Sequence, residues 1–231
     1  MTFVMIRQPG YLPNIGFFNK IQSSDVFIHL DDAQYAKDRF DNRNKIRTKD
    51  GFEWLTVPLK RPVFGKKLNE VLISYSNDWQ KNHLNLIFEN YQKTDYFSSY
   101  WNSIEHLIKK KHKKLINLNF ELINFFINEL KISTTIKLSS NFNTKKLKTE
   151  KLLELCNHVN TTTYISGISG KDYLDEKLFS NSGIKVVYEN FIHPIYNQFH
   201  GEFIEHMSII DLLFNVGENS SKILSDCKNI S

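Results

Sequence analysis

The sequence predicts an α/β fold with a mostly parallel, Rossmann-like sheet. Short β-rich runs alternate with helical periodicity in the first and last parts of the chain, and such repetition is typical of parallel strands joined by helical crossovers. The first apolar run, FVMI at 3–6, is uninterrupted, as expected of a strand buried on both faces. A block of helical spacing at about 78–131 interrupts the alternation. We therefore predict a single domain, 1–231, with a helical insertion at about 78–131.

The elements before the insertion are short and separated by turn residues. The strand at 3–6 ends at RQPGYLP, where two prolines and a glycine break regular structure. NIGFFNKIQ at 14–22 has the spacing of one or two helical turns, and DVFIHL at 25–30 resembles a second buried strand. EWLTVPL at 53–59 alternates like a strand and ends near Pro58.

The insertion and the remaining third have equally distinct patterns. Within the insertion, apolar residues at spacings of three and four predict helices at 79–93, 98–111 and 115–131. The last third then alternates again. Its predicted strands are 134–140, 163–167 and 183–190, its predicted helices are 149–160 and 207–217, and residues 168–179 are predicted to form a turn into a helix. The last helix is expected to stop at Gly217.

The composition limits the class of protein. Hydrophobic residues make up 41% of the chain, which is enough for a core, and the net charge is +5 with lysines mostly spread out. We therefore expect no DNA binding, but a mildly basic enzyme for phosphorylated substrates fits. Cys156 has the setting of an inert buried thiol. The short apolar run before Arg7 does not resemble a signal peptide, and no apolar stretch approaches the length of a membrane span. The expected location is the cytoplasm.

Four polar segments follow predicted strands: QPGYLP at 8–13, DDAQY at 31–35, SGISGK at 166–171 and HPIYNQ at 193–198. Ligands of open parallel sheets bind beyond the carboxyl ends of the strands. We therefore expect these four loops to converge on one cleft.

The candidate proton acceptors are two carboxylates and two histidines. Asp31 and Asp32 end a predicted buried strand, where one could act as a general base or orient an amine or ribose hydroxyl. The alternative is that they cap the next helix or pair with Arg43 or Lys45. His83 could take a proton from an attacking amine, or be a satisfied half-buried side chain. His193 precedes a proline, which holds it extended among polar neighbours.

The candidate ligand contacts are cations, amides and aromatic rings. Arg43 in NRNKIR could clamp a phosphate bidentately, or form a salt bridge to the acidic pair. SGISGK could bind an anion at a helix N-terminus, or be a plain βα turn. Trp54 could stack on a nucleobase or sugar, or pack in the core. No catalytic triad and no metal-binding motif is present. The predicted substrate contacts are Gln8, Tyr11, Gln34, Tyr35, Asn42, Arg43, Asn44, Lys45, Ser169, Lys171, Tyr196 and Gln198.

Several blocks together, RQPGYLPNIGFFNKI, LDDAQYAKDRFDNRNKIRT, WLTVPL, YISGISGKDYL, HPIYNQ and SIIDLLFNVG, resemble the WbqC-like protein family from about residue 4 to 217. Arg7 departs from the family, in which many relatives have His or another residue before Gln-Pro, so no catalytic role is carried over to it. The resemblance implies a bacterial enzyme of a surface-polysaccharide (O-antigen, lipopolysaccharide) gene cluster. Some such clusters make amino sugars that bear glycyl or other aminoacyl groups.

The leading hypothesis is therefore an acyl- or aminoacyltransferase acting on a nucleotide-linked amino sugar, for example a dTDP-4-amino-4,6-dideoxyhexose. Its diphosphate is expected on Arg43, Lys45 and Lys171, and its oxyanion donors are Gln8, Asn42 and Asn44. The acyl donor would be a thioester of CoA or of a carrier protein, or another activated aminoacyl group, and no cofactor or metal is required. The alternatives are an ATP-dependent carboxylate-activating enzyme and a non-catalytic module that binds glycan or a partner enzyme. The sequence leaves the sugar, the acyl group and the oligomeric state open.

Overall fold

The computed structural model describes residues 1–227 and has a central parallel sheet of five strands in the order β5-β2-β1-β6-β7. The strands are β1 (Phe3–Arg7), β2 (Val26–His29), β5 (Thr135–Leu138), β6 (Thr163–Ser166) and β7 (Lys185–Tyr188). β1 is the middle strand, paired in parallel with β2 on one side and with β6 on the other. The predicted α/β class with a mostly parallel sheet is confirmed.

Both faces of the sheet are covered, which explains the uninterrupted apolar run of β1. Val4 points into a small core with residues of α5 (Lys148–His158) and α6 (Glu176–Asn181). Met5 points into the larger core, which includes residues of α1 (Ile15–Gln22), α4 (Leu115–Glu129) and α7 (Ile209–Val216). Neighbouring side chains of a strand project to opposite faces, so a strand between two cores needs apolar residues at consecutive positions.

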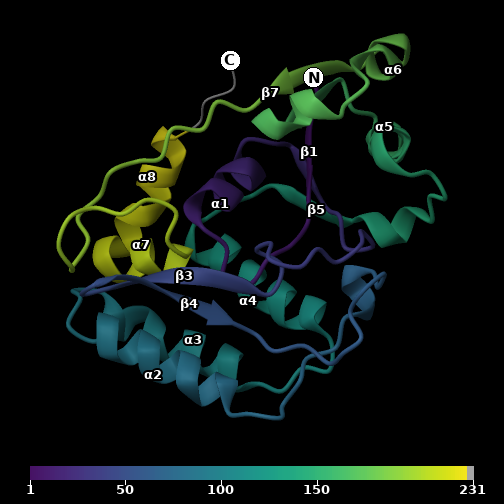
Figure 1. Cartoon of the computed structure of the whole chain (residues 1–231). Helices are drawn as coiled ribbons and strands as arrows, with labels where there is room; N and C mark the ends of the chain where they lie inside the picture. The colour runs from purple at the N-terminus through teal and green to yellow at the C-terminus, as the bar shows by residue number, and fades with distance from the viewer. Residues whose placement is uncertain (228–231) are drawn as a thin grey trace.

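The predicted helical insertion is confirmed as α2 (Trp79–Tyr91), α3 (Phe97–Lys109) and α4. α2 and α3 lie at the end of the molecule away from β7 and α6 (Figure 1), whereas α4 packs on the sheet, with the Phe120 ring 5.2 Å from that of His29 in β2. An antiparallel hairpin is formed by β3 (Arg43–Thr48) and β4 (Gly51–Thr56), and β3 contacts both α2 and α7. The predicted strand at 53–59 therefore belongs to this hairpin. The segment NRNKIR, expected as a ligand-binding loop, is its partner strand.

The segment after β6 forms a 3₁₀ turn, Ile168–Asp172, that leads into α6, in agreement with the predicted turn into a helix. The last third differs from expectation in a further helix, α8 (Ser220–Asp226), which follows α7. α7 ends at Gly217 as predicted, with a left-handed φ of 63°. A Cβ at this position would overlap the ring of Tyr96, so both backbone and packing favour glycine here. Within the described residues 1–227, none of the helices combines the length and the apolar character that a membrane crossing requires.

Candidate functional site

A cleft with a volume of about 930 Å³ lies beyond the carboxyl ends of the central strands. Its walls come from the segments that follow β1, β2 and β6, from α1, and from the start of α5. This volume is in the range of small-molecule sites, and the place is where open parallel sheets bind ligands. A hollow of about 400 Å³ on the helical side is lined in part by Glu105 and Lys109, which form a salt bridge with each other. The cleft at the sheet is therefore the stronger candidate.

The cleft carries an excess of positive charge. Two of its cations are already paired, Lys20 with the buried Glu189 and Lys151 with Asp32. The other three are exposed and form no salt bridge within residues 1–227; they are Arg7, Arg39 and Lys148. Free guanidinium and ammonium groups around a concave surface attract an anionic ligand.

One carboxyl group in this basic cleft has an unusual pKa. Asp41 is only 4% exposed, and burial raises the pKa of its carboxyl to about 6. The backbone N–H of Ala36 and the guanidinium groups of Arg7 and Arg39 act in the opposite direction, but burial prevails. The group is ionised at neutral pH and has a proton affinity suited to a general base.

The turn that contains Asp41 is fastened to the QPGY segment. The backbone N–H of Tyr11 donates to the Phe40 carbonyl at 3.2 Å, and Asn119 donates to the Asp41 carbonyl at 2.8 Å. A Cβ on Gly10 would lie 2.7 Å from the Phe40 oxygen, closer than real Cβ contacts. Gly10 therefore allows the two segments to approach, and the approach holds Phe40 and Asp41 at the cleft.

The two aspartates after β2 have different surroundings: Asp31 lies in the interior and Asp32 lines the cleft. Asp31 is buried and accepts hydrogen bonds from the Ser139 hydroxyl (3.0 Å) and the Ser140 backbone N–H (2.9 Å). Asp32 lines the cleft and lies 2.6 Å from Lys151. Burial raises the pKa of Asp32, but hydrogen bonds from Lys151 and Ser139 outweigh this and hold it below its usual value. Asp32 is thus an anchored carboxylate and a weak proton acceptor.

The comparisons with known proteins identify the family. The family model described as "WbqC-like protein family" matches residues 8–223. The chain belongs to this family. The chain is also 36% identical over 231 residues to "Uncharacterized protein Rv1507c" of Mycobacterium tuberculosis (strain ATCC 25618 / H37Rv), covering 99% of this chain and 100% of the relative. No solved structure matches the chain.

Five of the predicted site residues lie in the cleft of this WbqC-like protein: Gln8, Asp32, Gln34, Asn44 and Ser169. Their segments follow β1, β2 and β6, except for Asn44, which is in β3. The side chains differ in how free they are. Gln8 makes one long hydrogen bond, at 3.4 Å to the Gln34 carbonyl, whereas the Asn44 amide donates to the Leu12 carbonyl at 2.7 Å. Gln8 is therefore available to a ligand and Asn44 has a structural partner.

The fourth loop, HPIYNQ, does not converge with the other three. His193 is buried, donates from Nδ1 to the Pro194 carbonyl and accepts the His206 backbone N–H at Nε2. Tyr196 and Gln198 both donate to Asp211, at 2.8 Å each. No residue of the HPIYNQ loop itself lines the cleft. Phe191, before the loop, and His206, after it, do line it.

Two further predicted residues, His83 and Tyr11, also lie outside the cleft. The Tyr11 hydroxyl and His83 Nδ1 are 3.0 Å apart and buried. Burial lowers the pKa of His83 to about 4, so the ring is neutral at physiological pH. Both residues belong to the core between the QPGY segment and α2.

The predicted cations Arg43, Lys45 and Lys171 do not line the cleft. Arg43 donates to the Asp38 carbonyl at 2.9 Å and lies over the ring of Trp54, and Lys45 lies over Phe52. Lys171 lies 5.1 Å from the centre of the Tyr188 ring. The remaining two residues have internal partners: Asn42 donates to the Val57 carbonyl (2.8 Å) and accepts from the Tyr35 hydroxyl (3.1 Å).

Sequence reasoning missed Arg7, Lys20, Arg39, Asp41, Lys148 and Lys151 as cleft residues. Arg7 directly follows the predicted strand at 3–6 and is the last residue of β1. A position at a strand end could have identified it as a cleft residue. Arg39 and Asp41 stand within LDDAQYAKDRFDNRNKIRT, one of the blocks that resemble the family. Nothing in the sequence marked Lys20 or Lys151, which reach the cleft from α1 and α5.

Proposed function

We propose that the cleft binds a nucleotide-linked amino sugar and that the protein transfers an acyl or aminoacyl group to the sugar amine, as a step in bacterial surface-polysaccharide synthesis. The main support is the position of Asp41, a buried carboxyl with a pKa of about 6 beside two guanidinium groups in the cleft. A proton acceptor next to an anion-binding surface is what such a reaction needs.

The diphosphate of the substrate would lie on Arg7, Arg39 and Lys148. These replace Arg43, Lys45 and Lys171, which do not line the cleft. The three cleft cations are exposed and unpaired among residues 1–227, so binding a phosphate breaks no salt bridge. Lys148 also has a left-handed φ of 50°, a strained conformation that is commonest at functional sites.

Asp41 would then act as the general base. The neutral amine attacks the carbonyl carbon of the activated acyl donor, forming the C–N bond, and the nitrogen gives its proton to Asp41. The bond to the leaving thiolate or other activating group then breaks, and that group takes up a proton. Of the three predicted oxyanion donors, Gln8 has the weakest internal hydrogen bond, at 3.4 Å to the Gln34 carbonyl. The amides of Asn42 and Asn44 donate to backbone carbonyls at 2.8 and 2.7 Å.

The first test is a thermal-shift panel of dTDP-, UDP- and GDP-linked amino sugars, CoA and ATP. Selective stabilisation by an amino-sugar nucleotide identifies the acceptor, because a ligand that binds only the native state raises the melting temperature. Stabilisation by ATP alone would favour a carboxylate-activating enzyme instead. No response to any nucleotide sugar would contradict the proposal.

The second test is turnover of the stabilising sugar with acyl donors. Asp41→Asn keeps the size and an acceptor oxygen but removes the base, and is expected to lower kcat by about 10²- to 10⁴-fold. Asp172→Asn, an exposed carboxylate on the same cleft, is the matched control and should leave kcat unchanged. Equal activity of the two variants would eliminate Asp41 as the base.

A further inference from the structure

Three aromatic rings form an exposed surface next to the cleft, which we call the aromatic platform: Phe40, Phe52 and Trp54. They are 44%, 45% and 38% exposed, respectively. The ring centres of Phe40 and Trp54 are 5.9 Å apart and those of Phe52 and Trp54 are 6.5 Å apart, so the three are continuous. The interpretation of Trp54 as a core residue is therefore wrong. Isolated exposed rings are common on protein surfaces, but a continuous group beside a cleft is typical of a binding surface.

Cations from the neighbouring strand lie on this platform. Arg43 is 4.5 Å from the centre of the Trp54 ring, and Lys45 is 4.5 Å from that of Phe52. The register of the hairpin explains the arrangement, because Lys45 is directly opposite Trp54 on the same face. One carboxylate, Asp38, lies 3.5 Å from Arg43 and partly neutralises it. Aromatic rings combined with cations suit a ligand that has a π-face and negative charge.

The platform is continuous with the cleft through Phe40. This residue lines the cleft, and its neighbour Arg39 is one of the free cations proposed to hold the diphosphate. The Tyr11 N–H and the close approach of Gly10 fix the backbone of Phe40 in this position. A ligand whose phosphates contact Arg39 would have its next ring near Phe40.

We propose that Phe40 and Trp54 form the nucleobase subsite of the enzyme. The inference rests on the proposed function and refines it: the base stacks on the platform, the diphosphate lies on Arg7 and Arg39, and the amino sugar extends toward Asp41. Stacking accepts any base, because every base has a π-face. The subsite therefore adds affinity for the nucleotide without selecting strongly among bases.

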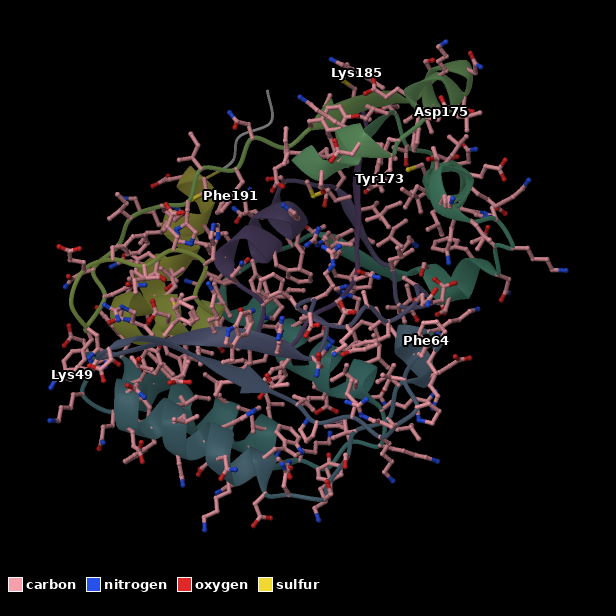
Figure 2. All side chains as sticks on the ribbon, in the orientation of Figure 1. Lys49, Phe64, Tyr173, Asp175, Lys185 and Phe191 are labelled. Atoms are coloured by element: carbon pink, nitrogen blue, oxygen red, sulfur yellow. The ribbon has the colours of Figure 1, made fainter. Side chains whose placement is uncertain are left out.

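The test compares binding of dTDP, UDP, GDP and inorganic pyrophosphate by calorimetry. Phe40→Ala and Trp54→Ala are each expected to weaken nucleoside diphosphate binding about 5- to 100-fold, the usual effect of removing one stacking ring, and to leave pyrophosphate binding unchanged. Phe64→Ala is the matched control, since this ring is 94% exposed and does not belong to the platform. Lys49 lies in the turn of the β3–β4 hairpin, and Figure 2 shows Phe64 on the opposite side of the molecule from it. The control variant should change neither affinity.

Tryptophan fluorescence gives a second measurement on correctly folded protein. Nucleoside diphosphates are expected to quench the emission of the wild type, and Trp54→Phe should remove the quenching while keeping an aromatic ring for stacking. Trp79 is 3% exposed and Trp101 packs on Phe97 within α3, so neither should respond.

The outcomes separate the two proposals. If nucleoside diphosphates bind the wild type and the two alanine variants equally well, the subsite is wrong and the proposed function stands. An equal loss of pyrophosphate and nucleotide affinity also eliminates the subsite, because the rings would then only maintain the cleft. If the wild type binds pyrophosphate and no nucleoside diphosphate, both proposals fail.

Discussion

Replacing Asp41 by Asn should stabilise the ligand-free protein at neutral pH even though it impairs the proposed reaction. The native state holds an ionised carboxylate at 4% exposure, which is unfavourable because burial favours the neutral form. Asparagine has nearly the same shape and carries no charge. The same burial that prepares Asp41 to accept a proton therefore lowers the free energy of unfolding.

The magnitude follows from the pKa. The usual carboxyl value is 3.8, and in the folded protein it is about 6. The folded state thus binds the proton more tightly than the unfolded state. The contribution of Asp41 is most favourable below about pH 4 and declines as the pH rises to about 6, by up to ~3 kcal/mol. The amide in the Asp41→Asn variant does not titrate, so the advantage of the variant should grow over this interval and level off above it.

Urea denaturation from pH 4 to pH 8 measures this difference. The wild-type and Asp41→Asn proteins are compared at each pH, because titration of all other groups, including His29 and His83, then cancels. Asp172→Asn should run parallel to the wild type. A stability difference between wild type and Asp41→Asn that does not vary with pH would refute the raised pKa and the role of Asp41 as base.

Three further changes test other parts of the structure. Asp211→Ala leaves three buried donors without their acceptor and should lower the free energy of unfolding by ~3–5 kcal/mol, measured by urea denaturation; a loss below ~1 kcal/mol would contradict the network. Gly10→Ala introduces a contact of 2.7 Å with a backbone oxygen and should cost ~1–3 kcal/mol, whereas Gly167→Ala, with nothing within 4 Å, should be nearly neutral. Lys151→Met removes the cation that keeps the pKa of Asp32 low and should cost ~1–3 kcal/mol at about pH 7. That stability is present in the wild type above about pH 4 and is lost as the pH falls, so the free energies of unfolding of the two proteins should converge in acid. If the difference between them did not change with pH, the ion pair of Lys151 and Asp32 would be excluded.

The fold could be predicted from the sequence where burial requires a regular pattern of apolar residues. A strand covered on both faces requires consecutive apolar residues, and FVMI and VFIH show this directly. The three inserted helices were visible because each buries one stripe. β3 was not recognised, because Asn44 and Ile46, which are buried, alternate with Arg43 and Lys45, cations that lie over aromatic rings of β4. Those contacts depend on a partner strand that a single segment does not reveal.

The site was accessible only in part. The rule that ligands bind at strand ends located three of the four loops, but it does not tell which side chain faces the cleft. Asp31 and Asp32 are neighbours, yet one is bound to Ser139 and Ser140 in the interior and the other lines the cleft. The pKa of Asp41 depends on its burial by distant segments, which the composition of KDRFDN does not record.

The central place of β1 also affects how the chain folds. β1 precedes the other strands of its sheet in the chain and needs partners on both edges, and the residue before it bonds to a segment 160 positions later. Closing so long a loop costs entropy before any contact repays it, and folding slows as contacts become more distant in sequence. On the ribosome, the β6 side of β1 must therefore stay unpaired until β6 emerges, while α2, α3 and α4, which are consecutive in the chain, can contact one another earlier. Chaperone dependence during synthesis should accordingly be greatest before residue 166 leaves the exit tunnel.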